Sequence, residues 1–132
     1  MNNLPKDAQV RSELFESLVG RYNATLVPGR YGGDYNNDQL AISEDNGNVT
    51  LFLGLKLLDS QGGLQLDAAS LGPHVQFSKP WFCALVASLK SSSGTVQLAV
   101  KIDSALAQNL LLACVVCMNP VAQEVKLLRI AV

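Results

Sequence analysis

The residues with the clearest chemical potential are three cysteines and one histidine. Cys114 and Cys117 have the C-x-x-C spacing found in redox pairs and zinc sites. A zinc site would also need Cys83 and His74 to converge on them from two other segments. On a strand, residues three apart point to opposite faces, which separates Cys114 from Cys117. We therefore expect buried, inert thiols, no metal site and no cofactor.

Catalytic motifs are missing from the rest of the chain. The sequence contains no G-x-S-x-G motif with a nucleophilic serine for which His74 could act as the base. It also contains no glycine-rich phosphate loop. The acidic stretch 44–48 lacks the spacing and the terminal glutamate of an EF-hand. The sequence thus predicts a non-catalytic protein, and an enzyme that works through His74 or a cysteine is kept as the third hypothesis.

Four aromatic side chains are the candidate ligand-binding residues: Tyr22, Tyr31, Tyr35 and Trp81. Aromatic rings at the mouth of a barrel can form a platform for a small apolar ligand. The alternative for Trp81, which follows Pro80 at the start of a predicted strand, is a place in the core.

The elements that would position these residues are suggested by three turn clusters, at 46–47, 60–63 and 91–94. Folding the chain at each turn places apolar residues opposite one another. The first turn pairs Leu40 with Leu53 and Ile42 with Leu51. The second pairs Leu55 with Ala68 and Leu57 with Leu66, and the third pairs Leu85 with Val100, Ala87 with Leu98 and Leu89 with Val96.

The resulting prediction is a single domain over 1–132, mainly β, with a short N-terminal helix at 5–19. An antiparallel meander of about eight strands over 21–132 would form a barrel or barrel-like sheet. After a run at 22–27, the expected strands are 39–45, 48–58, 64–70, 74–78, 81–90, 95–102, 109–118 and 124–132. The aliphatic inward face favours a filled interior, and a phase change near Leu127 and Leu128 suggests a bulge.

The competing prediction is an α+β fold with a C-terminal helix at 103–118. Asp103 would cap this helix, and good helix formers follow it. In favour of a strand, Val115 and Val116 are β-branched, and Asn119-Pro120 is a turn signal. Both alternatives stay open at this point.

One strand of the predicted sheet is apolar on both faces, the run 110–118. An antiparallel strand needs this only if its outer side is covered, by the N-terminal helix or by another subunit. We therefore expect a homo-oligomer, a dimer or larger, held together by outward-facing apolar residues. The interface residues we assign are Phe52, Val86, Leu111, Ala113 and Val116.

Two resemblances accompany these alternatives. Val19-Gly20-Arg21-Tyr22-Asn23, after a short helix, resembles the entry of lipocalin-type barrels, which implies a barrel. In the α+β alternative, the small acidic chain resembles type III secretion chaperones in size and charge, which implies a partner that lies across the sheet of a dimer.

The leading hypothesis is a small binding protein that self-associates and binds a protein or a small apolar ligand. An effector-binding chaperone is the second hypothesis. The net charge of −1 gives no reason to expect nucleic acid, and no run reaches the roughly 18 apolar residues of a membrane span. With an odd number of cysteines and no signal peptide at its start, the chain is expected to be cytoplasmic.

Overall fold

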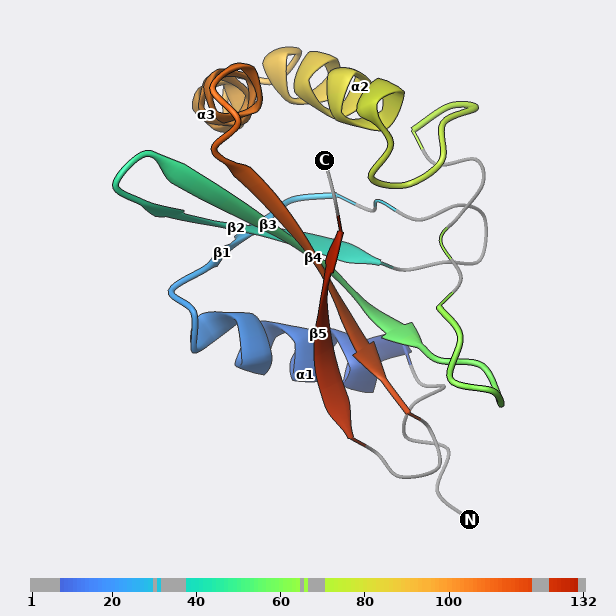
Figure 1. Ribbon diagram of the computed structural model, residues 1–132. Helices are drawn as coiled ribbons and strands as arrows, with labels where there is room; N and C mark the ends of the chain where they lie inside the picture. The colour runs from blue at the N-terminus through green and yellow to red at the C-terminus, as the bar shows by residue number, and fades with distance from the viewer. Residues whose placement is uncertain are drawn as a thin grey trace.

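The structure is an open five-stranded sheet with helices on both faces. This computed structural model describes residues 8–29, 31, 38–64, 66, 71–119 and 124–130. The strands follow one another across the sheet in chain order: β1 (Thr25–Val27), β2 (Gln39–Asp45), β3 (Asn48–Leu57), β4 (Leu111–Met118) and β5 (Val125–Ile130). Figure 1 shows α1 (Ala8–Gly20) on one side, and α2 (Lys79–Lys90) and α3 (Val96–Ala107) on the other.

The predicted eight-stranded barrel is wrong, because the sheet does not close. β1 and β5 lie at opposite edges, and each has a single neighbouring strand in the described part of the chain. The lipocalin-like architecture is therefore also excluded. The alternative α+β class is the one observed, although its helix was placed too late: α3 ends at Ala107, and 111–118 is a strand.

The first predicted hairpin is confirmed in its register. Leu40 lies opposite Leu53 and Ile42 opposite Leu51 in the antiparallel pair of β2 and β3. Asn46 and Gly47 both have positive φ, at 53° and 85°, as a two-residue turn of type I′ requires. Local turn chemistry and the period of two together determine this part of the fold.

The third predicted hairpin is a pair of helices, α2 and α3. The Ser78 side chain accepts a hydrogen bond from the Trp81 amide at 3.3 Å, and Pro80 occupies the first turn. The buried residues of α2 recur at helical spacing, and they are Trp81, Phe82, Leu85, Val86 and Leu89. Leu85 and Leu89 also suit a strand of period two, which is why the alternation was misleading.

The second predicted hairpin is absent from the described part of the chain. Leu64 and Leu66 lie outside any strand, and Ala68, the expected partner of Leu55, falls outside the described residues. Of the predicted strand 74–78, only His74 forms an isolated bridge, and 76–77 are turn residues.

The centre of the sheet is a parallel pair, β3 with β4, joined by the crossover that contains α2 and α3. Such a pair is covered on both faces, so its strands are apolar on both. This explains the double-sided run 110–118: Ala113 and Val115 pack toward α2 and α3, whereas Val116 and Met118 pack toward α1. Cover by the N-terminal helix, one of the two explanations offered, is thus observed.

The core has two parts, one on each face of the sheet. The larger, the α2–α3 cluster, contains Leu40, Leu51, Leu53, Trp81, Leu85, Ile102 and Val115 among others. The smaller, the α1 cluster, contains Phe15, Val19, Ala41, Phe52, Leu55, Val116 and Met118. No described helix is long and apolar enough to cross a membrane.

β5 runs without the predicted bulge. Leu127 pairs with Val116 and Leu128 with Val115 in an unbroken antiparallel register. The two leucines therefore lie on opposite faces, Leu127 against the α1 cluster and Leu128 against the α2–α3 cluster. Because β5 makes apolar contacts on both faces, two adjacent residues are apolar, and this pattern resembles the one that a bulge produces.

Candidate functional site

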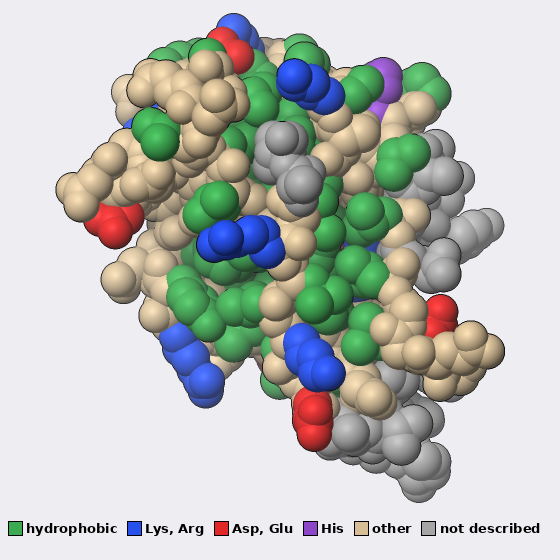
Figure 2. Space-filling model, viewed as in Figure 1, with side chains coloured by type: hydrophobic (Ala, Val, Ile, Leu, Met, Phe, Trp, Pro, Cys, Tyr) green, Lys and Arg blue, Asp and Glu red, His purple; other side chains and the backbone are tan. Residues whose placement is uncertain are grey.

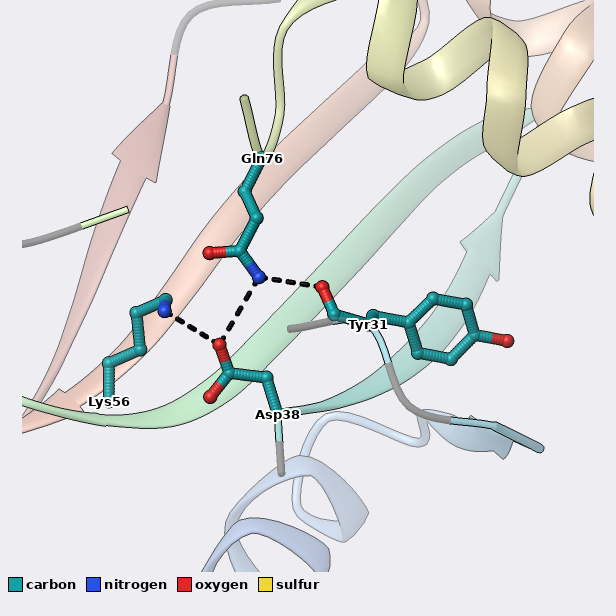
Figure 3. Close-up of polar contacts among 4 residues, drawn as sticks. All are labelled: Tyr31, Asp38, Lys56 and Gln76. Atoms are coloured by element: carbon teal, nitrogen blue, oxygen red, sulfur yellow. Dashed lines mark hydrogen bonds and ion pairs between the residues drawn. The ribbon is translucent and has the colours of Figure 1, made fainter. Parts of the chain in front are cut away.

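The most deeply buried polar group of the described chain is a cluster of three side chains (Figure 3). Lys56 Nζ lies 2.6 Å from Asp38 Oδ2, and these two side chains are 5% and 2% exposed. The Gln76 amide donates to the same carboxylate oxygen at 3.2 Å and to the Tyr31 carbonyl at 2.7 Å. The cluster ties together β3 and two segments that lie outside the strands and helices.

Lys56 reaches this cluster because the register of β3 shifts between Gly54 and Lys56. Leu53 faces the α2–α3 cluster, and strict alternation would place Leu55 there too. The shift instead sends Leu55 into the α1 cluster and turns Lys56 to the side of Cys117. An irregularity of this kind re-aims a side chain.

The chemistry of this cluster is structural. Each charge has its partner, and the side chains are almost fully covered, so a substrate has no access to them. A buried pair of this kind costs several kcal/mol if one partner is removed, roughly 3–5 kcal/mol. Asp38, Lys56 and Gln76 therefore hold the segments in place.

The described members of the predicted aromatic ligand site lie on both faces of the sheet, and their role in binding stays a prediction. Tyr22 is 47% exposed and lies 5.6 Å, centroid to centroid, from Phe52. Tyr31 is buried and donates its hydroxyl hydrogen bond to the Pro28 carbonyl at 2.5 Å. Trp81 is fully buried, as the core alternative had it. Tyr35 lies outside the described residues.

Of these aromatic residues, Tyr31 lines a hollow of about 330 Å³. Its other lining residues are Pro28, Gly29, Leu71, Ser88, Leu89, Ser91, Ser92 and Thr95. The Thr95 hydroxyl donates to the Leu89 carbonyl at 2.7 Å and is thereby already satisfied. This hollow contains no charged side chain among its described lining residues, so it has little with which to fix a ligand.

The three thiols do not come together in the structure. Cys114 and Cys117 lie on opposite faces of β4, as expected, and Cys83 is exposed on α2. Burial raises the pKa of Cys114 and of Cys117, which keeps both thiols protonated. Within the described residues, no three His, Cys, Asp or Glu side chains are close enough to hold a metal ion.

The five residues assigned to a subunit interface are all buried in the chain itself. Phe52 and Val116 belong to the α1 cluster, and Val86, Leu111 and Ala113 to the α2–α3 cluster. An interface through these side chains stays a prediction, and it would require this packing to open.

One partly exposed apolar surface lies along β5 and the adjacent start of β4. Figure 2 shows apolar side chains gathered on the side of the molecule that carries β4 and β5, with isolated basic side chains among them. Leu112 and Val125 are 37% and 40% exposed, and Leu127, Leu128 and Ile130 are half-buried. The charged residues of β5 itself are Lys126 and Arg129, both exposed.

A hollow of about 220 Å³ opens beside the end of β5. Leu106, Leu111, Leu112 and Ile130 give it apolar walls, Asn109 contributes an amide, and Lys79 and Arg129 bring two positive charges. No acidic side chain is found among its described lining residues. We call this hollow the basic pocket.

No family model matches this chain, and neither a curated protein nor a solved structure matches it. The geometry of the chain itself is therefore the basis for any functional proposal.

Sequence reasoning missed the buried cluster and the basic pocket. One signal was present for the cluster: Lys56 is the single charged residue in the apolar run from Val49 to Leu58. A lone charge in such a run indicates a buried partner. Nothing in the sequence joins Lys79 to Arg129, because the crossover that brings them together was interpreted as strands.

Proposed function

We propose that this chain is a non-catalytic binding protein that takes an extended polypeptide segment against the edge of the sheet at β5, where no second neighbouring strand is found among the described residues. The observation that carries the proposal is a six-residue edge strand whose neighbouring apolar side chains are only partly covered. A strand at a sheet edge presents unpaired backbone groups, and an added strand satisfies them.

The opposite edge is a poorer place for such a partner. β1 has three residues, Thr25–Val27, so it offers half the length of β5. Val27 is buried, and α1 packs next to β1. By contrast, the main contacts of α1 among the described elements are with β1 to β3 and not with β5.

The groups of the described residues that could react support binding over catalysis, because they are paired or protonated. The buried charges Lys56 and Asp38 neutralise each other, and Cys114 and Cys117 stay protonated. An enzyme that uses His74 or Cys83 remains the alternative, and it requires a partner group that the described residues do not place beside them.

A chaperone that holds an extended segment of another protein is the specific form of this proposal that the α+β class favours. The helices have 13, 12 and 12 residues, which is much more helix than the single short one of the barrel prediction. Self-association stays a second proposal, to be tested by sedimentation.

The test uses a fluorescent synthetic peptide with a neutral core of glutamine, valine, valine and glutamine. We expect its anisotropy to rise when the protein is added, and the amides of β5 to exchange more slowly with deuterium. The same peptide with N-methylated backbone amides is the control, because it cannot pair as a strand. Equal binding of both peptides, or protection confined to β1, contradicts the proposal.

A further inference from the structure

We infer that the segment recognised by β5 carries two acidic residues separated by two apolar residues. The inference rests on the proposed function, and it adds the chemistry of the partner. It follows from which side chains of β5 are basic, which are apolar, and on which face of the sheet each one lies.

The two basic residues of β5 lie on opposite faces of the sheet. Lys126 is opposite Cys117, whose side chain belongs to the α2–α3 cluster. Arg129 is opposite Cys114, which packs against the α1 cluster. Between them, Leu127 and Leu128 face the α1 side and the α2–α3 side.

A strand added to β5 must place its side chains on these same two faces. Residues directly opposite one another in a sheet share a face and interact, and successive residues alternate between faces. The positions opposite Leu127 and Leu128 therefore suit apolar residues. The positions opposite Lys126 and Arg129 suit carboxylates, which gives the order acidic, apolar, apolar, acidic.

The basic pocket is not where the carboxylate opposite Arg129 would lie. The Arg129 side chain faces the α1 side, opposite Cys114, whereas Lys79 begins α2 on the α2–α3 side. Both residues line the pocket at the end of β5, so Lys79 adds positive charge near this end, and the carboxylate opposite Arg129 pairs with Arg129 alone.

The same charges argue against a second copy of this chain as the occupant of β5. Pairing β5 with its own copy would bring Lys126 and Arg129 of both chains onto one six-residue seam, with Glu124 as the nearby acidic residue of each. Like charges across a strand pair are destabilising, and lysine on an edge strand discourages edge-to-edge pairing. An acidic segment turns these same charges into favourable pairs.

The experiment compares three fluorescent peptides of equal length by anisotropy at low salt. The first has the core glutamate, valine, valine, glutamate; the second has the same residues in the order valine, glutamate, glutamate, valine; the third is the neutral glutamine peptide. We expect the first to bind about tenfold more tightly than either of the others, corresponding to about 1.4 kcal/mol.

Charge reversal supplies the second arm. The double variant Lys126→Glu and Arg129→Glu should lose the preference for the acidic peptide and prefer a core of lysine, valine, valine, lysine. Lys90→Glu is the matched control, because Lys90 is exposed at the other end of α2 from Lys79. Circular dichroism and thermal melting verify that each variant is folded.

The outcomes separate this inference from the proposed function. Equal binding of all three peptides, with β5 protected, overturns the acidic preference and leaves strand addition intact. Binding of none of them overturns both. If the chain dimerises in sedimentation and acidic peptide fails to dissociate the dimer, a second copy occupies the edge, which also overturns the inference.

Discussion

Lys56 is a buried charged residue that joins segments distant in the sequence. It occupies an apolar strand, yet its ammonium group is neutralised by Asp38 at 2.6 Å and is almost wholly covered. Gln76 donates to the same carboxylate and thereby brings a distant segment into the arrangement. The attraction within such a buried pair adds little to the stability of the fold. Removing one partner is costly, because the other charge is then buried without compensation.

We predict that Lys56→Met lowers the free energy of unfolding by about 3–5 kcal/mol, because Asp38 is left charged and buried. Adding Asp38→Asn should recover part of this loss. The measurement is urea denaturation. Lys101→Met is the matched control: its pair with Glu44, at 3.1 Å, is half-exposed, and such surface pairs contribute less than about 1 kcal/mol. If both variants lose the same free energy of unfolding, the Lys56–Asp38 pair is not buried as described.

A second residue-level prediction concerns the thiols. We expect Cys83 to react first with a thiol reagent at neutral pH, Cys114 more slowly, and Cys117 only with unfolding, since Cys117 is fully buried. Mass spectrometry of the labelled chain measures the order.

The same thiols make stability depend on pH in the alkaline range. Because burial raises the pKa of Cys114 and Cys117 in the folded chain, the folded state retains protons that the unfolded state loses above the ordinary value of 9.0. Their contribution to stability is complete below that pH and decreases as the pH rises above it. If the free energy of unfolding stays constant across this alkaline range, burial does not raise the pKa of these two thiols.

The elements of this fold differ in how well local sequence predicts them. The β2–β3 hairpin was predictable because its turn, Asn46-Gly47, has one preferred geometry and its register follows. α2 and α3 were not predictable from the alternation of apolar residues. In α2, for example, Leu85 and Leu89 fit a strand of period two as well as a helix. The Ser78 cap was a local signal that pointed to the correct answer.

The functional surface was less predictable than the elements. β5 was expected at nearly its observed position, but its status as an edge depends on the parallel pairing of β3 with β4. No turn signal encodes that pairing, because the two strands are joined through two helices. The aromatic residues were assigned to a barrel mouth; without a barrel, Tyr31 and Trp81 lie in the α2–α3 cluster and Tyr22 lies beside Phe52.

Gly54 provides a prediction at this scale. A Cβ at this position would lie 2.5 Å from the Val116 carbonyl oxygen of the neighbouring strand. We expect Gly54→Ala to lower the free energy of unfolding by about 1–3 kcal/mol through overpacking. Gly20→Ala is the control, since nothing lies within 4 Å of the added group. If the two variants unfold at the same denaturant concentration, β3 and β4 are not in close contact at this point.

For the whole molecule, the position of the sheet between α1 and the α2–α3 pair changes what an interface mutation should do. Val116 is fully buried beneath α1 rather than exposed on an outer face. We predict that Val116→Glu unfolds much of the protein, because it buries an unpaired charge. Val100→Glu, at a position 57% exposed, should change stability by less than about 0.5 kcal/mol.

Circular dichroism and sedimentation together measure this outcome. Loss of helix signal in the Val116 variant, with a folded Val100 variant, agrees with the packing described above. A Val116 variant that stays folded and merely becomes smaller in sedimentation would restore the homo-oligomer that the sequence suggested.

The parallel seam between β3 and β4 has a consequence for how the chain folds. On either side of it are neighbouring strand pairs, β2 with β3 and β4 with β5, whose partners are close in sequence and can meet early. The seam joins residues separated by the whole crossover, as in the pairing of Val49 with Leu111. Contacts this distant form slowly. During synthesis, the two halves of the sheet cannot join until β4 has left the ribosome, so until then β3 is an exposed, aggregation-prone edge.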